Sequence, residues 1–204
     1  VPIDKEISRK TMELVQANTS SSDVRGGFDI YEINSDTIER IKNEKRPDKI
    51  KIFNTYKSLD FFIEKNAGGS PYLLSIGQKA EEIVSHYLER QTETKETLDG
   101  LLRLTEEIEK AEDEKEKLKM PLEIFSVYWI LRDKKIKNPE KLSWELKDTF
   151  ENYPSWKESE QHEREIRKAI YQMLIHGGIE DPKRLNSLAK ETMNLLKGVP
   201  NDNT

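Results

Sequence analysis

The stretch SPYLLSIGQKAEEIVSHYLERQTETKETLDGLLRLTEEIEKAEDEKEKLK, residues 70–119, decides the fold of this chain. After Pro71 no proline interrupts it, and one set of positions recurs in alternating steps of four and three residues. These positions are Ala80, Val84, Tyr87, Gln91, Thr94, Leu98, Leu101, Thr105 and Ile108. A repeat of about 3.5 residues is typical of a long helix that packs along a continuous seam.

The middle of this seam is weak. Gln91 and Thr94 are polar, and Gly100 costs about 1 kcal/mol relative to alanine inside a helix. Either the helix bends near residues 91–94, or a polar partner meets it there. We predict one long helix with a soft centre.

The sequence on both sides also has helical periodicity, interrupted by glycine and proline. Further helices are expected over 3–17, from Asn34/Ser35, from Pro47 to Gly68, over 121–131, from Pro139 to Phe150, over 166–174 and over 181–197. Residues 18–27 form a breaker-rich loop, and Phe28, Ile30 and Ile33 form a short extended segment. The expected fold is therefore all-α, an elongated helical bundle around one long central helix, with more than 60% helix.

The predicted domain organisation has three parts. Residues 1–69 form an N-terminal helical subdomain, residues 70–198 form the long-helix and bundle subdomain, and residues 199–204 form a disordered tail. The chain begins with Val1 rather than methionine, which agrees with a piece of a longer protein.

The composition excludes several classes of protein. Charged residues make up 36% of the 204 residues and hydrophobic residues 34%, which predicts a thin core with long solvated faces. The net charge of −5 argues against a dedicated nucleic-acid wrapper, which is usually basic. The absence of cysteine excludes disulfides and suits a reducing cytoplasm. We find no segment typical of a membrane span or a secretion signal.

No catalytic constellation is recognisable, and we predict no catalytic, cofactor-binding or metal-ligating residue. The glycines around Ser70 lack the spacing of a phosphate-binding loop. Asp48 and the later Glu93-Thr94-Lys95 mimic a nuclease pattern but lie in helical surroundings, whereas such carboxylates converge on a metal from adjacent strands. The three histidines, His86, His162 and His176, are isolated from one another, so none has the spacing of a zinc site.

Two basic clusters remain. The first consists of Arg40, Lys42, Lys45, Arg46, Lys49 and Lys51, and the second of Arg132, Lys134, Lys135, Lys137 and Lys141. Either cluster could contact phosphates, and we take the first as the candidate phosphate-contacting surface. The alternative, that these lysines and arginines are only a solvated helix rim, stays open.

The segment from Pro121 to Leu131 leaves little polar face, so it predicts a helix that is buried on most sides. Phe125, Tyr128 and Trp129 are its large side chains. We expect these three residues at the centre of the core.

Three stretches together resemble a known family. They are SPYLLSIGQKAEEIVSHYLERQTETKETLDGLLRLTEEIEKAEDEKEKLKMPLEIFSVYWIL (70–131), FDIYEINSDTIERIKNE (28–44) and FENYPSWKESEQHEREIRKAIYQML (150–174). The long helix with its Arg-Gln step, the charged run, the aromatic helix and the Pro–Trp turn are similar to the C-terminal helical domain of type I restriction enzyme R subunits. The resemblance extends over roughly residues 28–175, and residues 181–197 have no counterpart in it.

The resemblance implies a function for a longer parent protein. R subunits carry a metal-dependent nuclease domain and two ATP-driven translocase domains upstream of this region, so the parent would use ATP and Mg²⁺ as a site-specific deoxyribonuclease. The C-terminal domain is expected to dock on the methyltransferase and specificity subunits and on the motor domains of its own chain, and to help guide DNA. The nuclease and motor motifs do not occur in this chain, so the chain by itself is expected to be non-catalytic.

Two other functions stay open. An unrelated helical adaptor or coiled-coil module would use the 80–108 seam to form homo-oligomers. It would be expected to keep apolar residues at Gln91 and Thr94. A complete small nuclease is a third hypothesis, and it would have to bind a divalent metal.

Overall fold

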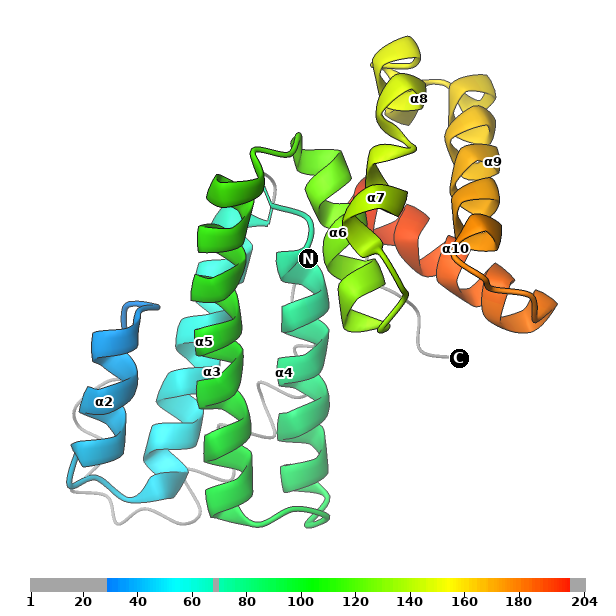
Figure 1. Ribbon diagram of the computed structural model, residues 1–204. Helices are drawn as coiled ribbons and strands as arrows, with labels where there is room; N and C mark the ends of the chain where they lie inside the picture. Colours follow the sequence, from blue (N-terminus) through cyan, green and yellow to red (C-terminus); the bar gives the residue numbers. More distant parts are fainter. Residues whose placement is uncertain (1–28, 68–69, 199–204) are drawn as a thin grey trace. The chain divides into compact units, whose positions relative to one another are not determined.

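The computed structural model describes residues 29–67 and 70–198, and helices account for 77% of these (Figure 1). No strand occurs among these residues, so the prediction of an all-α fold is confirmed. Residues 29–33, expected to be extended, precede the first described helix without forming a strand. The predictions for 1–28, for Gly68-Gly69 and for the tail 199–204 lie outside the described residues.

The described chain divides into two compact units. The first contains residues 29–66 and Ile76–Lys117, and the second contains residue 67, residues 70–75 and residues 118–198. This differs from the predicted boundary between residues 69 and 70. The physical reason is that most of the predicted long-helix segment packs with the helices before it, which a boundary drawn along the chain cannot represent.

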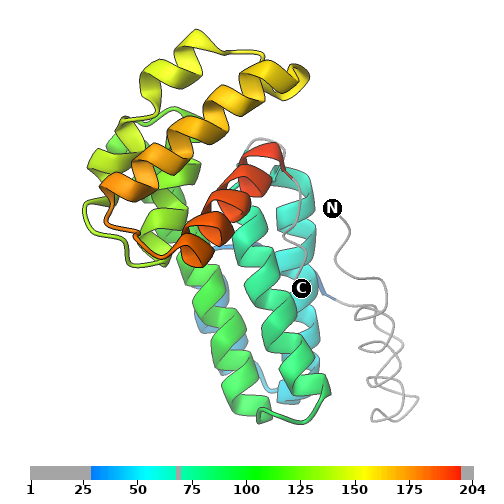
Figure 2. The same ribbon diagram turned by 90° about the vertical axis from the view of Figure 1, so that its right-hand side faces the viewer.

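The first unit is a bundle of antiparallel helices. Its elements are α2 (Ser35–Asn43), α3 (Asp48–Asn66), most of α4 (Leu73–Leu88) and α5 (Thr94–Leu118). Figures 1 and 2 show α3, α4 and α5 side by side. The α2 helix begins after Asn34, whose side chain accepts a hydrogen bond from the Thr37 backbone, as expected for a capped start. Ile52, Leu59 and Leu101 are completely buried in this unit.

The prediction of one long helix over 70–119 is wrong. The chain turns between Leu88 and Thr94, so α4 and α5 form a helical hairpin. Arg90 closes α4 in the left-handed region (φ 58°), and the Gln91 backbone N–H donates to the His86 carbonyl at 2.8 Å. Lys79 on α4 pairs with Glu107 on α5 at 2.8 Å, which ties the two helices together.

The predicted seam is confirmed at six of its nine positions, and these six are covered within the same chain. Most of the predicted seam positions are buried: Ala80, Val84, Leu98, Leu101, Thr105 and Ile108. The two polar positions, Gln91 and Thr94, lie at the turn and at the start of α5. Two helices that fold back on each other bury the same stripe as one helix against a partner, so the repeat alone does not distinguish them.

We expect Thr94→Pro to leave the free energy of unfolding within about 1 kcal/mol of the wild-type value. Thr94 is the first residue of α5, where proline loses no helical hydrogen bond. In a continuous helix the same change costs about 3 kcal/mol or more. Urea denaturation measures the difference, with Thr105→Pro inside α5 as the destabilised control. A loss of stability as large as in that control would contradict the hairpin and support a single long helix.

The second unit contains the C-terminal helices. They are α6 (Leu122–Asp133), α7 (Pro139–Trp144), α8 (Lys147–Asn152), a 3₁₀ turn (Trp156–Glu158), α9 (Glu160–His176) and α10 (Pro182–Lys197). The predicted helix from Pro139 to Phe150 is thus two short helices. α6 packs on α7 and α10, and α9 packs on α7, α8 and α10. Ser159 and Asp181 cap the starts of α9 and α10 with their side chains.

The α6 helix supplies the aromatic core of the second unit. Phe125 and Trp129 are fully buried and Tyr128 nearly so, which confirms the prediction for these three residues. Tyr72, which the sequence did not single out, packs edge-on against Phe125 with ring centroids 5.2 Å apart. It also contacts Trp129, at 5.4 Å. The Arg132 guanidinium lies over the Trp129 ring, 3.9 Å from the ring centroid, in a cation–π contact. A positively charged group thus covers one side of this aromatic core.

Candidate phosphate-contacting surface

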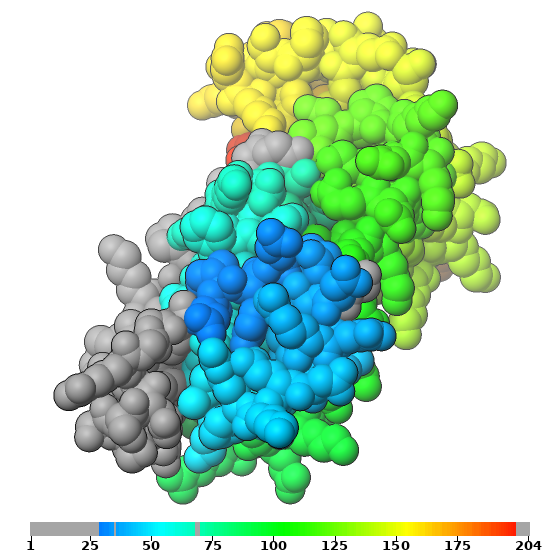
Figure 3. Space-filling model, turned by 90° about the vertical axis from the view of Figure 1, so that its left-hand side faces the viewer, coloured from blue at the N-terminus to red at the C-terminus, as the bar shows by residue number. Residues whose placement is uncertain are grey.

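The six cations of the first basic cluster lie on two helices and their connection. Arg40 and Lys42 are on α2, Lys45 and Arg46 are in residues 44–47, and Lys49 and Lys51 begin α3. Figure 3 shows this part of the first unit, in blue, on the surface of one face. The cluster is therefore assembled at one end of a helical hairpin, but its members differ in what they contact.

Arg46 is neutralised within the protein. Its guanidinium pairs with Asp29 and, at 2.8 Å, with Glu44. The hydrogen bond to Asp29 raises the pKa of Arg46 above its usual value. The positive charge of Arg46 is thus already paired with two carboxylates. Its contacts connect Asp29 to residues 44–47, so Arg46 is not a free cation for a phosphate.

Tyr31 joins the same network. Its backbone N–H donates to Ser58 Oγ at 2.7 Å and its hydroxyl donates to Glu44 at 2.9 Å. Asn54 donates to the Tyr31 hydroxyl at 3.3 Å, and burial raises the pKa of Tyr31. The contacts of Asp29 and Tyr31 fasten residues 29–31 onto α3 and the 44–47 connection. The charge pattern of the sequence gave no sign of this network, because its members are up to 29 positions apart.

Lys51 is wrongly predicted as a phosphate contact. It is buried, and its ammonium group lies 3.5 Å from Asp48. It shares one stripe of α3 with three other buried polar residues, Asn54, Thr55 and Ser58, at steps of three and four. The sequence rule that lysine is exposed fails here because α3 buries a polar face as well as an apolar one.

Three lysines of the first basic cluster are placed so that they could contact phosphates. Lys42, Lys45 and Lys49 are exposed, and none has an ion-pair partner in the described part of the chain. Arg40 is also exposed, and its guanidinium lies 5.3 Å from the centre of the Tyr31 ring. The candidate surface is thus reduced to these three lysines, with Arg40 beside them.

The second basic cluster also contains both cations that have a partner and cations that are exposed. Arg132 stacks on Trp129, and Lys134 pairs with Glu191 of α10 at 2.8 Å. Lys135, Lys137 and Lys141 are exposed, without an ion pair in residues 29–67 and 70–198. We keep the first three-lysine set as the candidate surface, because the exposed Arg40 lies beside it, whereas Arg132 of the second cluster is stacked on Trp129.

The groups tested for catalysis lie on separate elements. Asp48 begins α3, whereas Glu93 precedes α5 and Lys95 lies in its first turn. His176 pairs with Glu145 at 2.8 Å, and the ring of His162 lies against that of Tyr153. The described residues contain no group of three or more side chains arranged to hold a metal ion. Nor does any described helix combine the length and apolar character needed to cross a membrane.

Comparison with known proteins returns no relative. No protein-family model, no curated protein and no solved structure matches this chain.

Proposed function

We propose that this chain is a non-catalytic docking domain, the C-terminal helical part of the restriction subunit of a type I restriction-modification system. One observation carries the proposal. Most aromatic and apolar side chains of the resembling stretches are used for helix packing, whereas Lys42, Lys45 and Lys49 stay exposed and unpaired in the described part of the chain. Rigid helices with free cations are suited to binding partners rather than to chemistry.

The stretches that carry the resemblance coincide with structural elements. Residues 70–131 form the α4–α5 hairpin and most of α6, and residues 150–174 run from the end of α8 through the buried Trp156 into α9. In the proposed parent, ATP and Mg²⁺ would be bound by domains upstream, and we assign no residue of this chain to either. A cytoplasmic location belongs to the same proposal.

The coiled-coil alternative is not favoured by the geometry. A homo-oligomer built on the 80–108 seam needs that seam on the surface, but its aliphatic positions are buried within the first unit. Opening the hairpin to expose them would lose that burial, at roughly 25 cal/mol for each Å² of apolar surface.

The proposed function is tested by binding to the methyltransferase–specificity complex encoded with the parent gene. Immobilised chain is expected to retain this complex in the absence of DNA. It is not expected to hydrolyse ATP or cleave DNA. Lack of retention, or DNA-stimulated ATP turnover that mutations in this chain abolish, would overturn the proposal.

We expect weak, sequence-independent DNA binding by the chain alone, with dissociation constants of about 10⁻⁴ to 10⁻⁶ M at physiological salt. Replacing Lys42, Lys45 and Lys49 together by glutamine should make the slope of log K against log salt shallower by up to about 2.7, since each phosphate contact contributes about 0.9. Fluorescence anisotropy with a labelled duplex measures the slope.

The control variant replaces Lys95, Lys110 and Lys117 by glutamine. It removes the same charge from exposed lysines of the same unit. Equal slopes for the two triple variants would show that the predicted surface is only a solvated rim, and the role would narrow to protein docking.

A further inference from the structure

The connection between α2 and α3 carries part of the candidate phosphate-contacting surface. Lys45 lies in this connection, Lys42 precedes it in the last turn of α2, and Lys49 follows it in the first turn of α3. Among the described residues, no backbone hydrogen bond is donated by residues 44–46. The arrangement of the three lysines therefore depends on side-chain contacts that the connection makes.

Tyr31 contacts this connection from an earlier part of the chain. Its hydroxyl donates to the Glu44 carboxylate at 2.9 Å, and Glu44 in turn pairs with Arg46 at 2.8 Å. The Arg40 guanidinium lies over the Tyr31 ring, 5.3 Å from the ring centre, in a cation–π contact. One side chain thus reaches both the connection and the exposed arginine beside the three lysines.

Tyr31 is itself held on α3 by buried polar side chains. Ser58 Oγ accepts from the Tyr31 backbone N–H at 2.7 Å, and Asn54 Nδ2 donates to the Tyr31 hydroxyl at 3.3 Å. Asn54 and Ser58 are each only 1% exposed, and Asn54 Oδ1 has no hydrogen-bond partner among the described residues. A buried polar atom without a partner lowers stability, so packing alone does not explain an asparagine here. Its contact with Tyr31 does.

We infer that Tyr31 is a positioning residue for the candidate phosphate-contacting surface. Tyr31 is buried, so it acts through Glu44, which it ties to α3, rather than on a phosphate itself. Groups that are held in place before a partner arrives lose less conformational entropy on binding. The inference rests on the proposed function, because it takes the three lysines as phosphate contacts, and it adds the residue that holds them.

The test uses Tyr31→Phe, which removes the hydroxyl and keeps the ring beside Arg40. Fluorescence anisotropy should show that the variant binds a labelled duplex roughly two- to tenfold more weakly at every salt concentration, the range for ordering one further side chain on binding. The slope of log K against log salt should stay the same, because the number of phosphate contacts is unchanged. This parallel shift differs from the shallower slope expected when the three lysines are replaced.

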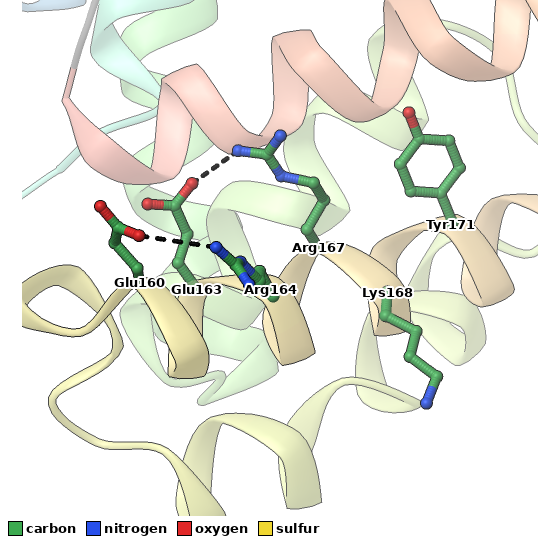
Figure 4. Close-up of a pocket in the computed structure, with 6 residues that line it drawn as sticks. All are labelled: Glu160, Glu163, Arg164, Arg167, Lys168 and Tyr171. Carbon is green, nitrogen blue, oxygen red and sulfur yellow. Dashed lines mark hydrogen bonds and ion pairs between the residues drawn. The ribbon is translucent and has the colours of Figure 1, made fainter.

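The matched control is Tyr171→Phe in the second unit, where Figure 4 shows Tyr171 on α9. It also removes a hydrogen-bonded hydroxyl, since Tyr171 donates to Asn186 of α10 at 2.7 Å. Duplex binding by this control should equal that of wild type. A second readout is amide hydrogen exchange, which should be faster at residues 44–46 in Tyr31→Phe and unchanged there in the control.

Equal duplex affinity of Tyr31→Phe and wild type would overturn the inference, as would unchanged exchange at residues 44–46 or an equal loss of affinity in the control. A shallower salt slope in Tyr31→Phe would also overturn it, because cations would then be lost from the interface rather than misplaced. If the wild-type chain binds no duplex, the inference fails, but retention of the methyltransferase–specificity complex leaves the docking function standing. If that complex is not retained while the parallel shift is observed, the inference stands and the docking function is wrong.

Discussion

Trp129→Ala is expected to lower the free energy of unfolding by about 3–5 kcal/mol, the range for deleting a large buried aromatic side chain. Trp129 is fully buried, contacts Tyr72 and Phe125, and carries Arg132 over its ring. Its indole N–H has no hydrogen-bond partner among the described residues, so the loss comes from packing and the cavity, not from a broken hydrogen bond. Thermal and urea denaturation followed by circular dichroism measure the effect.

The matched control is Trp144→Ala. Trp144 is a half-buried tryptophan of α7 in the same unit, so its removal should cost clearly less. An unchanged melting temperature in Trp129→Ala, or equal losses in the two variants, would contradict the assignment of Trp129 to the centre of the core.

Leu101→Ala is expected to cost about 2–5 kcal/mol, as for other fully buried leucines. Leu101 lies in the middle of α5 on the predicted seam and is completely buried in the first unit. Because its seam is covered within the chain, the melting temperature of both wild type and variant should not depend on protein concentration.

The concentration series is what distinguishes the hairpin from a homo-oligomeric coiled coil. In the coiled coil, unfolding is coupled to dissociation, so stability would rise with protein concentration and Leu101→Ala would also shift the oligomeric state. Leu118→Ala, at the half-buried end of α5, is the control and should have a smaller effect. A concentration-dependent wild-type melting temperature would refute the intramolecular seam.

Local patterns were sufficient for several features of the structure. Helical periodicity and the scarcity of strand patterns predicted the all-α class, and Asn34, Asn138, Asp181 and the glycines at 177 and 178 marked helix ends close to where they occur. The almost uniformly apolar segment around Trp129 predicted burial on most sides. These features depend on residues within one or two helical turns, which the sequence displays directly.

The candidate sites were less predictable, because charge counts do not show which charges are paired. Arg46 is neutralised by Asp29 and Glu44, and Lys51 is buried, although both belong to the same basic run as the exposed Lys45 and Lys49. The contacts between α9 and α10 were missed for a related reason, because Lys197 pairs with Glu163 and Asn186 with Tyr171 across the two helices.

The sequence by itself thus determined the helical class, most of the buried apolar positions and the aromatic centre at α6, since these depend on local periodicity and side-chain type. Only the tertiary structure decided that the 70–119 segment reverses at Arg90–Glu93, that Ile76–Lys117 belongs with the helices before it, and which cations have no ion-pair partner among the described residues. The physical reason is that an apolar stripe predicts that one face of a helix is buried, but not which surface it packs against. A seam against another molecule and a seam against the next helix have the same pattern, and only the folded chain shows which contact forms.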